Sequence, residues 1–319
     1  RRRPLWEIYY IEGLGQNRFA VYSKVHHALV DGMGGVWLAL MALGTDPKAE
    51  AIAPWSVDMP DRPRAEAPTL SERLDTASRV VTDLSLQNLR QTVDWAARLS
   101  GSHERADLPF AAPVTRFNGR VDGQRRFATR SLSIKRLKAV AKATESTLND
   151  VVLAITGSAL RTWMLEQDEL PARSLVATCP VSVRSADGAG NNLSALLADL
   201  ATEIDGPLAR LARVSESTQR GKRMIAQMSR DAAQGWALAM GVLGLAPAMV
   251  NGGKTLPPLA NLVISNVPGP REARYLGGAR LGGYFPVSIL THGQGLNITL
   301  VSRDKAVDFG ITGSRGLVE

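Results

Sequence analysis

The sequence predicts a mixed α/β protein built from two domains. Its 319 residues correspond to about two domains at roughly 150 residues each. A content of 45% apolar and 21% charged residues is typical of a globular chain. Strand-like and helical segments alternate, and those near the end have hairpin-like spacing, which favours mixed sheets over a purely parallel sheet. We expect the two parts to be residues 1–115 and residues 116–319.

In the first part, aromatic and β-branched residues predict two strands around a turn at residues 13–17. Glycines 32, 34 and 35 form the turn that precedes an apolar helix. Residues 44–68 are rich in Pro, Ala, Asp and Glu, which indicates a surface linker. Thr69 and Glu72 have the spacing of a capping box at the start of a second helix. The predicted elements are strands at 6–11 and 18–25 and helices at 36–43 and 69–100.

The second part combines long helices with a strand-rich final third, which Gly and Pro interrupt often. Residues 146–150 provide capping side chains for a long apolar helix. The apolar segment 236–250 contains glycines and a proline, and we interpret it as a buried helix; its alternative is a helix lying in a bilayer interface. The predicted strands are 127–134, 174–183, 193–200, 262–265, 279–281, 285–290, 296–302 and 306–311, and the predicted helices are 134–144, 151–166 and 206–230.

The cysteine content and the net charge exclude some kinds of site and favour some kinds of partner. The single cysteine, Cys179, excludes a disulfide framework and a multi-cysteine zinc site, and its apolar strand indicates a structural role. The net charge of +8 favours anionic partners such as phosphates, anionic lipid or nucleic acid. Basic residues gather around one strand and the following helix: Arg125, Arg126, Lys135, Arg136, Lys138 and Lys142. A solvated face explains this cluster without a ligand.

The segment with the clearest chemical character is His26-His27-Ala28-Leu29-Val30-Asp31-Gly32, where an apolar strand ends at glycines. Histidine suits proton transfer near neutral pH. Adjacent strand residues point to opposite faces, so one histidine should face inward and the other a crevice as the base. Asp31 orients an imidazole directly or pairs with a distant arginine. A buried histidine pair with a capping aspartate is the structural alternative, and the absence of further His or Cys ligands argues against a metal.

The His26-His27 and Asp31-Gly32 pairs resemble the active-site motif of the coenzyme A-dependent acyltransferase superfamily, which includes chloramphenicol acetyltransferase and condensation domains of peptide synthetases. Further segments narrow the resemblance to the bacterial wax ester synthase/acyl-CoA:diacylglycerol acyltransferase family. They are Pro4-Leu5-Trp6, Asn149-Asp150, the segment 261–270 (NLVISNVPGP) and the segment 293–299 (GQGLNIT). The resemblance covers nearly the whole chain.

The resemblance implies two subdomains of the chloramphenicol-acetyltransferase type, with mixed sheets flanked by helices and a tunnel between them. It implies a fatty acyl transfer from acyl-CoA, the co-substrate, to a fatty alcohol or a diacylglycerol, with no permanently bound cofactor. The second histidine, His27, is similar to the family's general base and lies near the middle of the tunnel. His26 has a structural role in the site. Asp31, beside Gly32, is similar to the aspartate that holds the loop through an arginine, for which Arg184 is the candidate.

Three further residues take roles from the resemblance. Asn149 matches the Asn-Asp motif and stabilises the oxyanion or the carbonyl; the alternative for Asn149-Asp150 is a plain helix N-cap. Trp6 lines the acyl channel, with ordinary core packing as its alternative. Asn266 is a candidate for substrate binding, and a rigid turn explains its segment equally well.

The expected partners are acyl-CoA, the lipid acceptor and a peripheral contact with the inner membrane face or with lipid inclusions, from the cytoplasm. Family members also carry a segment before Pro4-Leu5-Trp6, which is an expected partner of the N-terminal subdomain. Two alternatives remain within this fold: an acyltransferase or condensation enzyme with another acceptor, and a non-catalytic lipid-binding relative. A nucleic-acid-binding protein is suggested by charge alone and lacks a recognisable motif.

Overall fold

The structure is a computed structural model, and it describes residues 4–26, 29, 32–50, 52, 53, 56, 111–183, 192–227 and 258–319. The chain divides into two compact units. Unit 1 comprises residues 1–63, 267–284 and 302–304, and unit 2 comprises residues 64–266, 285–301 and 305–319. The subdomain boundary expected near residue 115 stays a prediction.

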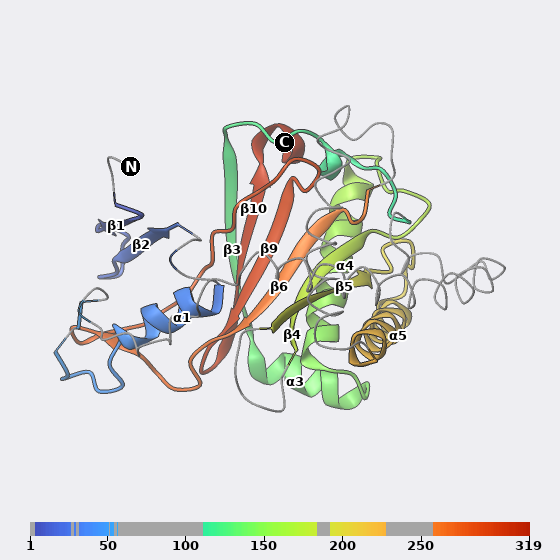
Figure 1. Cartoon of the computed structure of the whole chain (residues 1–319). Coiled ribbons are helices and arrows are strands. Elements are labelled where there is room, and N and C mark those ends of the chain that lie inside the picture. The colour runs from blue at the N-terminus through green and yellow to red at the C-terminus, as the bar shows by residue number, and fades with distance from the viewer. Residues whose placement is uncertain are drawn as a thin grey trace, which may run out of the picture. The chain divides into compact units, whose positions relative to one another are not determined.

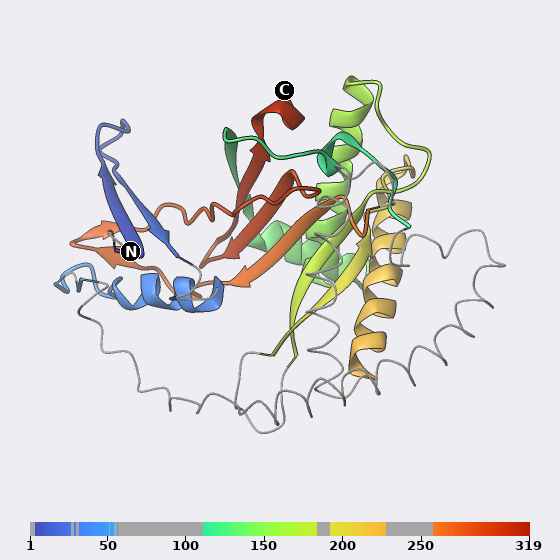
Figure 2. The same cartoon turned by 45° about the horizontal axis from the view of Figure 1, so that its top comes forward.

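The described residues of unit 1 form two short hairpins and one α-helix. Strands β1 (Trp6–Ile11) and β2 (Ala20–Val25) pair antiparallel, as Figure 2 shows, in a register that opposes Trp6 to Val25. Strands β7 (Tyr275–Leu276) and β8 (Ala279–Arg280) pair around two glycines with φ of 52° and 83°. A turn with two positive φ values is the tight hairpin turn for which glycine is suited. Both predicted strands of the first hairpin are confirmed.

Helix α1 (Gly32–Met41) begins earlier than the sequence predicted. We expected glycines 32, 34 and 35 to form a turn before a helix at residue 36. They lie instead inside the first turn of α1, although glycine disfavours helices. The apolar residues that follow extend the helix. Val36, inside the helix, and Ala42, directly after it, are buried. Beyond α1, Gly44 and Tyr275 exchange two backbone hydrogen bonds of 2.9 Å, which join the first two of the three segments of unit 1.

The described part of unit 2 contains a six-stranded sheet with helices on one face (Figure 1). The strand order is β3-β10-β9-β6-β4-β5. The pair β3–β10 and the pair β4–β5 are antiparallel, whereas β4 and β6 are parallel, so the sheet is mixed as predicted. The strands are β3 (Arg125–Ser133), β4 (Val176–Val183), β5 (Asn192–Asp199), β6 (Leu262–Pro268), β9 (Leu296–Ser302) and β10 (Ala306–Ser314).

The larger helices of unit 2 are α3 (Ile134–Ala143), α4 (Leu148–Glu166) and α5 (Pro207–Ala226). A short 3-10 turn, η3 (Arg116–Asn118), precedes β3, and α7 (Arg315–Val318) ends the chain. Helix α5 contacts both α4 and β5. Among the described residues, no helix combines the length and the apolar character needed to cross a bilayer. The predicted helix 69–100 and the apolar segment 236–250 lie outside the described residues.

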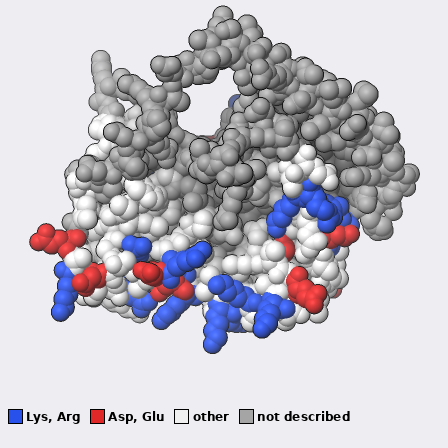
Figure 3. Space-filling view, turned by 60° about the horizontal axis from the view of Figure 1, so that its bottom comes forward, with Lys and Arg blue, Asp and Glu red and all other residues white. Residues whose placement is uncertain are grey.

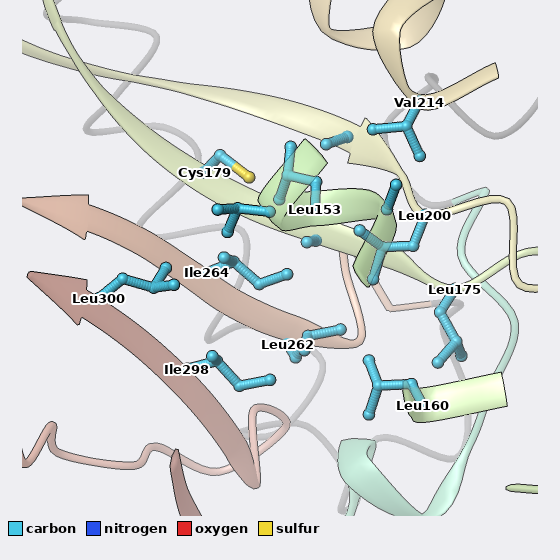
Figure 4. Close-up of a cluster of buried hydrophobic side chains, with 14 of the residues drawn as sticks. Leu153, Leu160, Leu175, Cys179, Leu200, Val214, Leu262, Ile264, Ile298 and Leu300 are labelled. Atoms are coloured by element: carbon cyan, nitrogen blue, oxygen red, sulfur yellow. The ribbon is translucent and has the colours of Figure 1, made fainter. Parts of the chain in front are cut away.

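The core of unit 2 lies between the sheet and α4. Figure 4 shows Leu153 and Leu160 of α4 among side chains from four strands and their ends. Alternate residues of β6 and β9, such as Ile264 and Ile298, point toward this core because strand side chains alternate between faces. These fully buried aliphatic side chains each contribute about 2 kcal/mol through removal from water.

The predicted strand at 285–290 was wrong, because this segment pairs with no strand among the described residues. Its alternating apolar pattern resembles a strand, but Pro286 has no N–H to donate to a ladder. The segment crosses β10 instead. A side chain at Gly310 would collide with the carbonyl of Pro286, so glycine there permits the crossing. Asp308, two residues before Gly310, also has a structural position, because it is buried and accepts a 2.6 Å hydrogen bond from Ser131.

Gly157 permits the closest approach of α4 to the sheet. A Cβ at this position would overlap the backbone carbonyl oxygen of Leu200, at the end of β5. Gly157→Ala is therefore expected to lower the free energy of unfolding by about 1–3 kcal/mol, through overpacking against rigid backbone. Urea unfolding followed by circular dichroism measures the effect. Gly123→Ala is the matched control, because nothing lies within 4 Å of a Cβ there. Equal urea midpoints for the two variants would contradict the close approach.

Candidate functional site

The β1–β2 hairpin brings two of the sequence motifs together. Trp6 opposes Val25, and the backbone N–H of His26 donates a 2.7 Å hydrogen bond to the carbonyl of Leu5. The Pro4-Leu5-Trp6 motif therefore lies directly beside the start of the histidine motif, although about twenty residues separate them along the chain. Within unit 1, the two motifs form one local structure.

The structure describes part of the histidine motif. His26 is exposed at the end of β2, and its carbonyl accepts a 2.9 Å hydrogen bond from Leu29 N–H, which starts a turn. Gly32 is the first residue of α1. Trp6 is 42% exposed, so packing in the core does not account for it. His27, Asp31 and Arg184 lie outside the described residues, and their predicted roles stay predictions.

Asn149 lies in the first turn of α4, but it does not cap the helix. Thr147 is the N-cap: its hydroxyl accepts a 3.2 Å hydrogen bond from the backbone N–H of Asp150. The carboxylate of Asp150 accepts a 2.9 Å bond from the backbone N–H of Thr147, which completes a capping box. The capping alternative for Asn149-Asp150 therefore holds for Asp150, which completes the capping box, and is wrong for Asn149, because Thr147 is the N-cap.

Asp150 has a purely structural arrangement. Its side chain is fully buried, and its two oxygens also accept hydrogen bonds from Thr218 at 2.6 Å and Ser215 at 3.3 Å. Both hydroxyls belong to α5, so one carboxylate caps α4 and joins it to α5. A buried carboxylate is stable only when hydrogen bonds replace its hydration, as they do here. The capping spacing was visible in the sequence, but the bonds to α5 were not.

The structure brings Asn149 next to Asn266. The side-chain amide of Asn266 donates a long hydrogen bond of 3.5 Å to Oδ1 of Asn149, across 117 residues of sequence. Asn149 is half-buried and Asn266 is exposed, so both amides face accessible space. Because Oδ1 of Asn149 accepts this bond, its Nδ2 is directed elsewhere as a donor. The pair therefore places two side-chain amides together at the start of α4.

The first asparagine of the 261–270 motif has a different function. Asn261 is fully buried; its Oδ1 accepts a 2.9 Å bond from the backbone N–H of Val176, and its Nδ2 donates a 2.9 Å bond to Asn118. Asn118 in turn donates 3.0 Å bonds to the carbonyls of Ala260 and Gly293. These amides replace backbone pairing where loops meet the sheet. Sequence analysis missed this network, and the only signal for it was Asn261 at the start of the family motif.

Cys179 is buried in the core, and burial raises the pKa of its thiol to about 12. A thiol in this state is protonated at neutral pH and is a poor nucleophile. Its structural interpretation agrees with this environment. Among the described residues, no group of three or more His, Cys, Asp or Glu side chains has the arrangement of a metal site.

This environment predicts the reactivity of Cys179. The native protein is expected to react very slowly with a thiol reagent such as 5,5′-dithiobis(2-nitrobenzoate) at about pH 8, where free thiols are partly ionised. The urea-unfolded protein is expected to release one equivalent of the coloured thiol, because the chain has one cysteine. Absorbance over time measures both rates. Rapid labelling of the native protein would show that the thiol is accessible.

Comparisons with known proteins place these residues in a family context. The family model for the wax ester synthase/diacylglycerol acyltransferase catalytic domain matches residues 1–152, and the model for the C-terminal domain of the same family matches residues 189–319. A Mycobacterium tuberculosis protein named as a diacylglycerol O-acyltransferase is 41% identical over 324 residues, covering 99% of this chain and 70% of the relative.

Solved structures agree. The wax ester synthase/diacylglycerol acyltransferase from Marinobacter aquaeolei is 33% identical, with a TM-score of 0.71, covering 99% of this chain and 67% of that chain. A starter condensation domain of rhizomide synthetase, crystallised with C8-CoA, is similar at a TM-score of 0.50 and 15% identity, over 99% of this chain and 65% of that chain. This second likeness concerns the fold alone. The predicted resemblance and the predicted fold class are both confirmed.

Proposed function

Because the chain belongs to the wax ester synthase/diacylglycerol acyltransferase family, we propose that it transfers a fatty acyl group from acyl-CoA to the hydroxyl of a fatty alcohol or of a diacylglycerol. The observation that carries the proposal is the 41% identity over 99% of the chain. The aligned region includes the complete motif from His26 to Gly32. Acyl-CoA is the co-substrate, and no resident cofactor takes part.

The proposed chemistry is a direct transfer. His27 accepts the proton of the acceptor hydroxyl while the oxygen attacks the thioester carbonyl, which gives a tetrahedral intermediate with a negative oxygen. The C–S bond then breaks, the ester is released, and protonated His27 returns its proton to the CoA thiolate. Every proton is accounted for, and no acyl-enzyme forms. The protonated and buried thiol of Cys179 supports a mechanism without a cysteine nucleophile.

Asn149 is proposed to stabilise the oxyanion, with Asn266 as the residue that positions it. The hydrogen bond between the two amides and the position of Asn149 in the first turn of α4 support this assignment. Preorganised donors at a helix N-terminus stabilise developing negative charge without reorganisation. Trp6 is proposed to contact the acyl chain, and its exposed side chain on the strand that pairs with the start of the histidine motif supports this role.

The remaining predicted features complete the proposal. His26 supports the motif structurally, and Asp31 holds the loop that ends at Gly32, the first residue of α1, through an ion pair with Arg184. The reaction takes place in a tunnel between two subdomains divided near residue 115, and CoA and the lipid acceptor enter from different faces. The enzyme acts at the inner membrane face or at lipid inclusions, where its substrates concentrate.

The test measures release of free CoA thiol from palmitoyl-CoA, with hexadecanol or a diacylglycerol as acceptor and with products identified by mass. Hexadecane is the matched control, because it has the same chain and lacks the hydroxyl. Thiol release that requires the hydroxyl and yields hexadecyl hexadecanoate or triacylglycerol is the expected result, and the faster acceptor identifies the substrate. Thiol release at the same rate with hexadecane would contradict acyl transfer to an alcohol.

A further inference from the structure

The basic residues predicted to form one cluster around β3 separate into two groups. Arg125 and Arg126 begin β3, where they form ion pairs with Asp122 and Glu319, respectively. The other end of β3 lies about 27 Å away, at roughly 3.4 Å per residue. The second group belongs to that end and to α3. It comprises Lys135, Arg136, Lys138, Lys142 and, in the turn before β10, Lys305, and we call these five residues the α3 basic surface.

The α3 basic surface is exposed and carries uncompensated charge. All five side chains are exposed, and none forms an ion pair within the described part of the chain. Its members are continuous, because the backbone N–H of Ile134 donates a 3.1 Å hydrogen bond to the carbonyl of Lys305. Figure 3, which turns the lower side of Figure 1 and hence α3 toward the viewer, shows Lys and Arg side chains on this face, with Asp and Glu side chains among them.

The positions of these residues do not favour the helix itself. Ser133 is the N-cap of α3, so Lys135 and Arg136 lie in the first turn, where the helix has no acidic residue. Cations at a helix N-terminus oppose the helix dipole and destabilise the helix by a few tenths of a kcal/mol each. Their side chains therefore add to the positive potential at this end of α3, which makes the surface attractive to anions.

The composition of the exposed side of α3 favours an extended anionic surface as the partner. The buried face of α3, with Leu137 and Ala141, packs on the protein. Val140 lies on the flank of this face, one turn after Arg136, and is 43% exposed. An exposed apolar residue at the border of a basic face is typical of helices that lie on a membrane interface. No aromatic residue lies in α3, whereas surfaces that bind single-stranded nucleic acid combine basic with aromatic residues.

We infer that the α3 basic surface docks the enzyme on an anionic phospholipid surface. The choice of lipid over another polyanion rests on the proposed function, because an enzyme with lipid substrates gains from binding where they collect. Each basic residue near an anionic bilayer strengthens partitioning by roughly fivefold. The attraction decreases within a Debye length and weakens as salt is added.

The experiment measures co-sedimentation of the purified chain with vesicles of phosphatidylcholine alone or with one third phosphatidylglycerol. Binding only to the anionic vesicles, weaker at about 0.5 M than at about 0.1 M salt, is expected. The variant K135Q/R136Q/K138Q/K142Q is expected to bind about two to three orders of magnitude more weakly. The control R120Q/R173Q/K222Q/R223Q removes the same charge from exposed positions outside the surface and is expected to retain most of the binding.

A charge-conserving variant serves as the control for folding. The variant K135R/K138R/K142R keeps the charge and is expected to bind like the parent, which separates charge from folding. Equal losses in the two glutamine variants, no vesicle binding by the parent, or binding of a single-stranded oligonucleotide in place of vesicles would each overturn the inference. The sedimentation measurement needs no turnover. Acyl transfer to a dispersed alcohol in detergent, measured in parallel, therefore shows separately whether the proposed function holds.

Discussion

His27→Ala is expected to lower kcat/KM for acceptor-dependent CoA release by about 10²–10⁴-fold, the usual contribution of a general base. The acceptor hydroxyl is a weak nucleophile until its proton is removed. The CoA sulfur leaves more easily when it receives a proton as the C–S bond breaks. One imidazole performs both transfers, so its removal affects both steps. Steady-state thiol release with hexadecanol, with the ester quantified by mass, measures the loss.

The control for His27→Ala is another histidine with a defined structural environment. His292 accepts a 3.0 Å hydrogen bond from the backbone N–H of Val121 in a loop before β9, far along the chain from the motif. His292→Asn keeps an acceptor at that position and is expected to retain kcat/KM within a few-fold. Activity of His27→Ala within tenfold of the parent, with an unchanged circular dichroism spectrum, would contradict the assignment of the base.

Asp150→Ala is expected to produce the largest loss of stability, about 3 kcal/mol, because a cap and two buried hydrogen bonds are lost together. The substitution removes the acceptor of the backbone N–H of Thr147 and of the Ser215 hydroxyl, and it leaves the Thr218 hydroxyl with only its 3.1 Å bond to the carbonyl of Ser215. Unsatisfied buried donors cost more than the bonds themselves contribute. The urea midpoint, followed by far-ultraviolet circular dichroism, measures the change.

Asn149→Ala provides the matched comparison, because the two residues are adjacent in the first turn of α4. Its amide caps nothing, so the free energy of unfolding, obtained from the urea titration, is expected to stay within about 0.5 kcal/mol of that of the parent. The turnover number is expected to fall by about 10²-fold, as for removal of one oxyanion donor. If Asn149→Ala lost stability and kept its turnover number, the division of roles between the two residues would be wrong.

Local signals in the sequence predicted the elements well where periodicity and capping agreed. The aromatic and β-branched run at Trp6–Ile11 and the apolar run at Leu296–Ser302 are strands with the predicted bounds. Helix α4 begins at its capping side chains, one turn earlier than its apolar run. The failures have local causes too. Residues 285–290 alternate like a strand but contain Pro286, and the first glycines of α1 are held in a helix by the apolar residues after them.

The candidate site was predictable as a set of residues but not as an arrangement. A motif supplies residue types in order, whereas the pairing of Asn149 with Asn266 depends on β6 ending beside the start of α4. No pattern along the chain specifies which strands become neighbours in the sheet. For the same reason, the sequence analysis did not predict the hydrogen bonds from α5 to Asp150, or that Trp6 pairs with the strand residue just before His26. Arg184 as the partner of Asp31 stays a prediction.

The central claim is that the acyl group moves directly from CoA to the acceptor oxygen. The most direct measurement mixes the enzyme with palmitoyl-CoA, first without and then with hexadecanol, and follows the intact protein mass and the free thiol together. The account predicts no mass increase on the protein, and CoA release equal to the ester formed, only after hexadecanol is added. A burst of thiol without acceptor, accompanied by a palmitoylated protein, would contradict it.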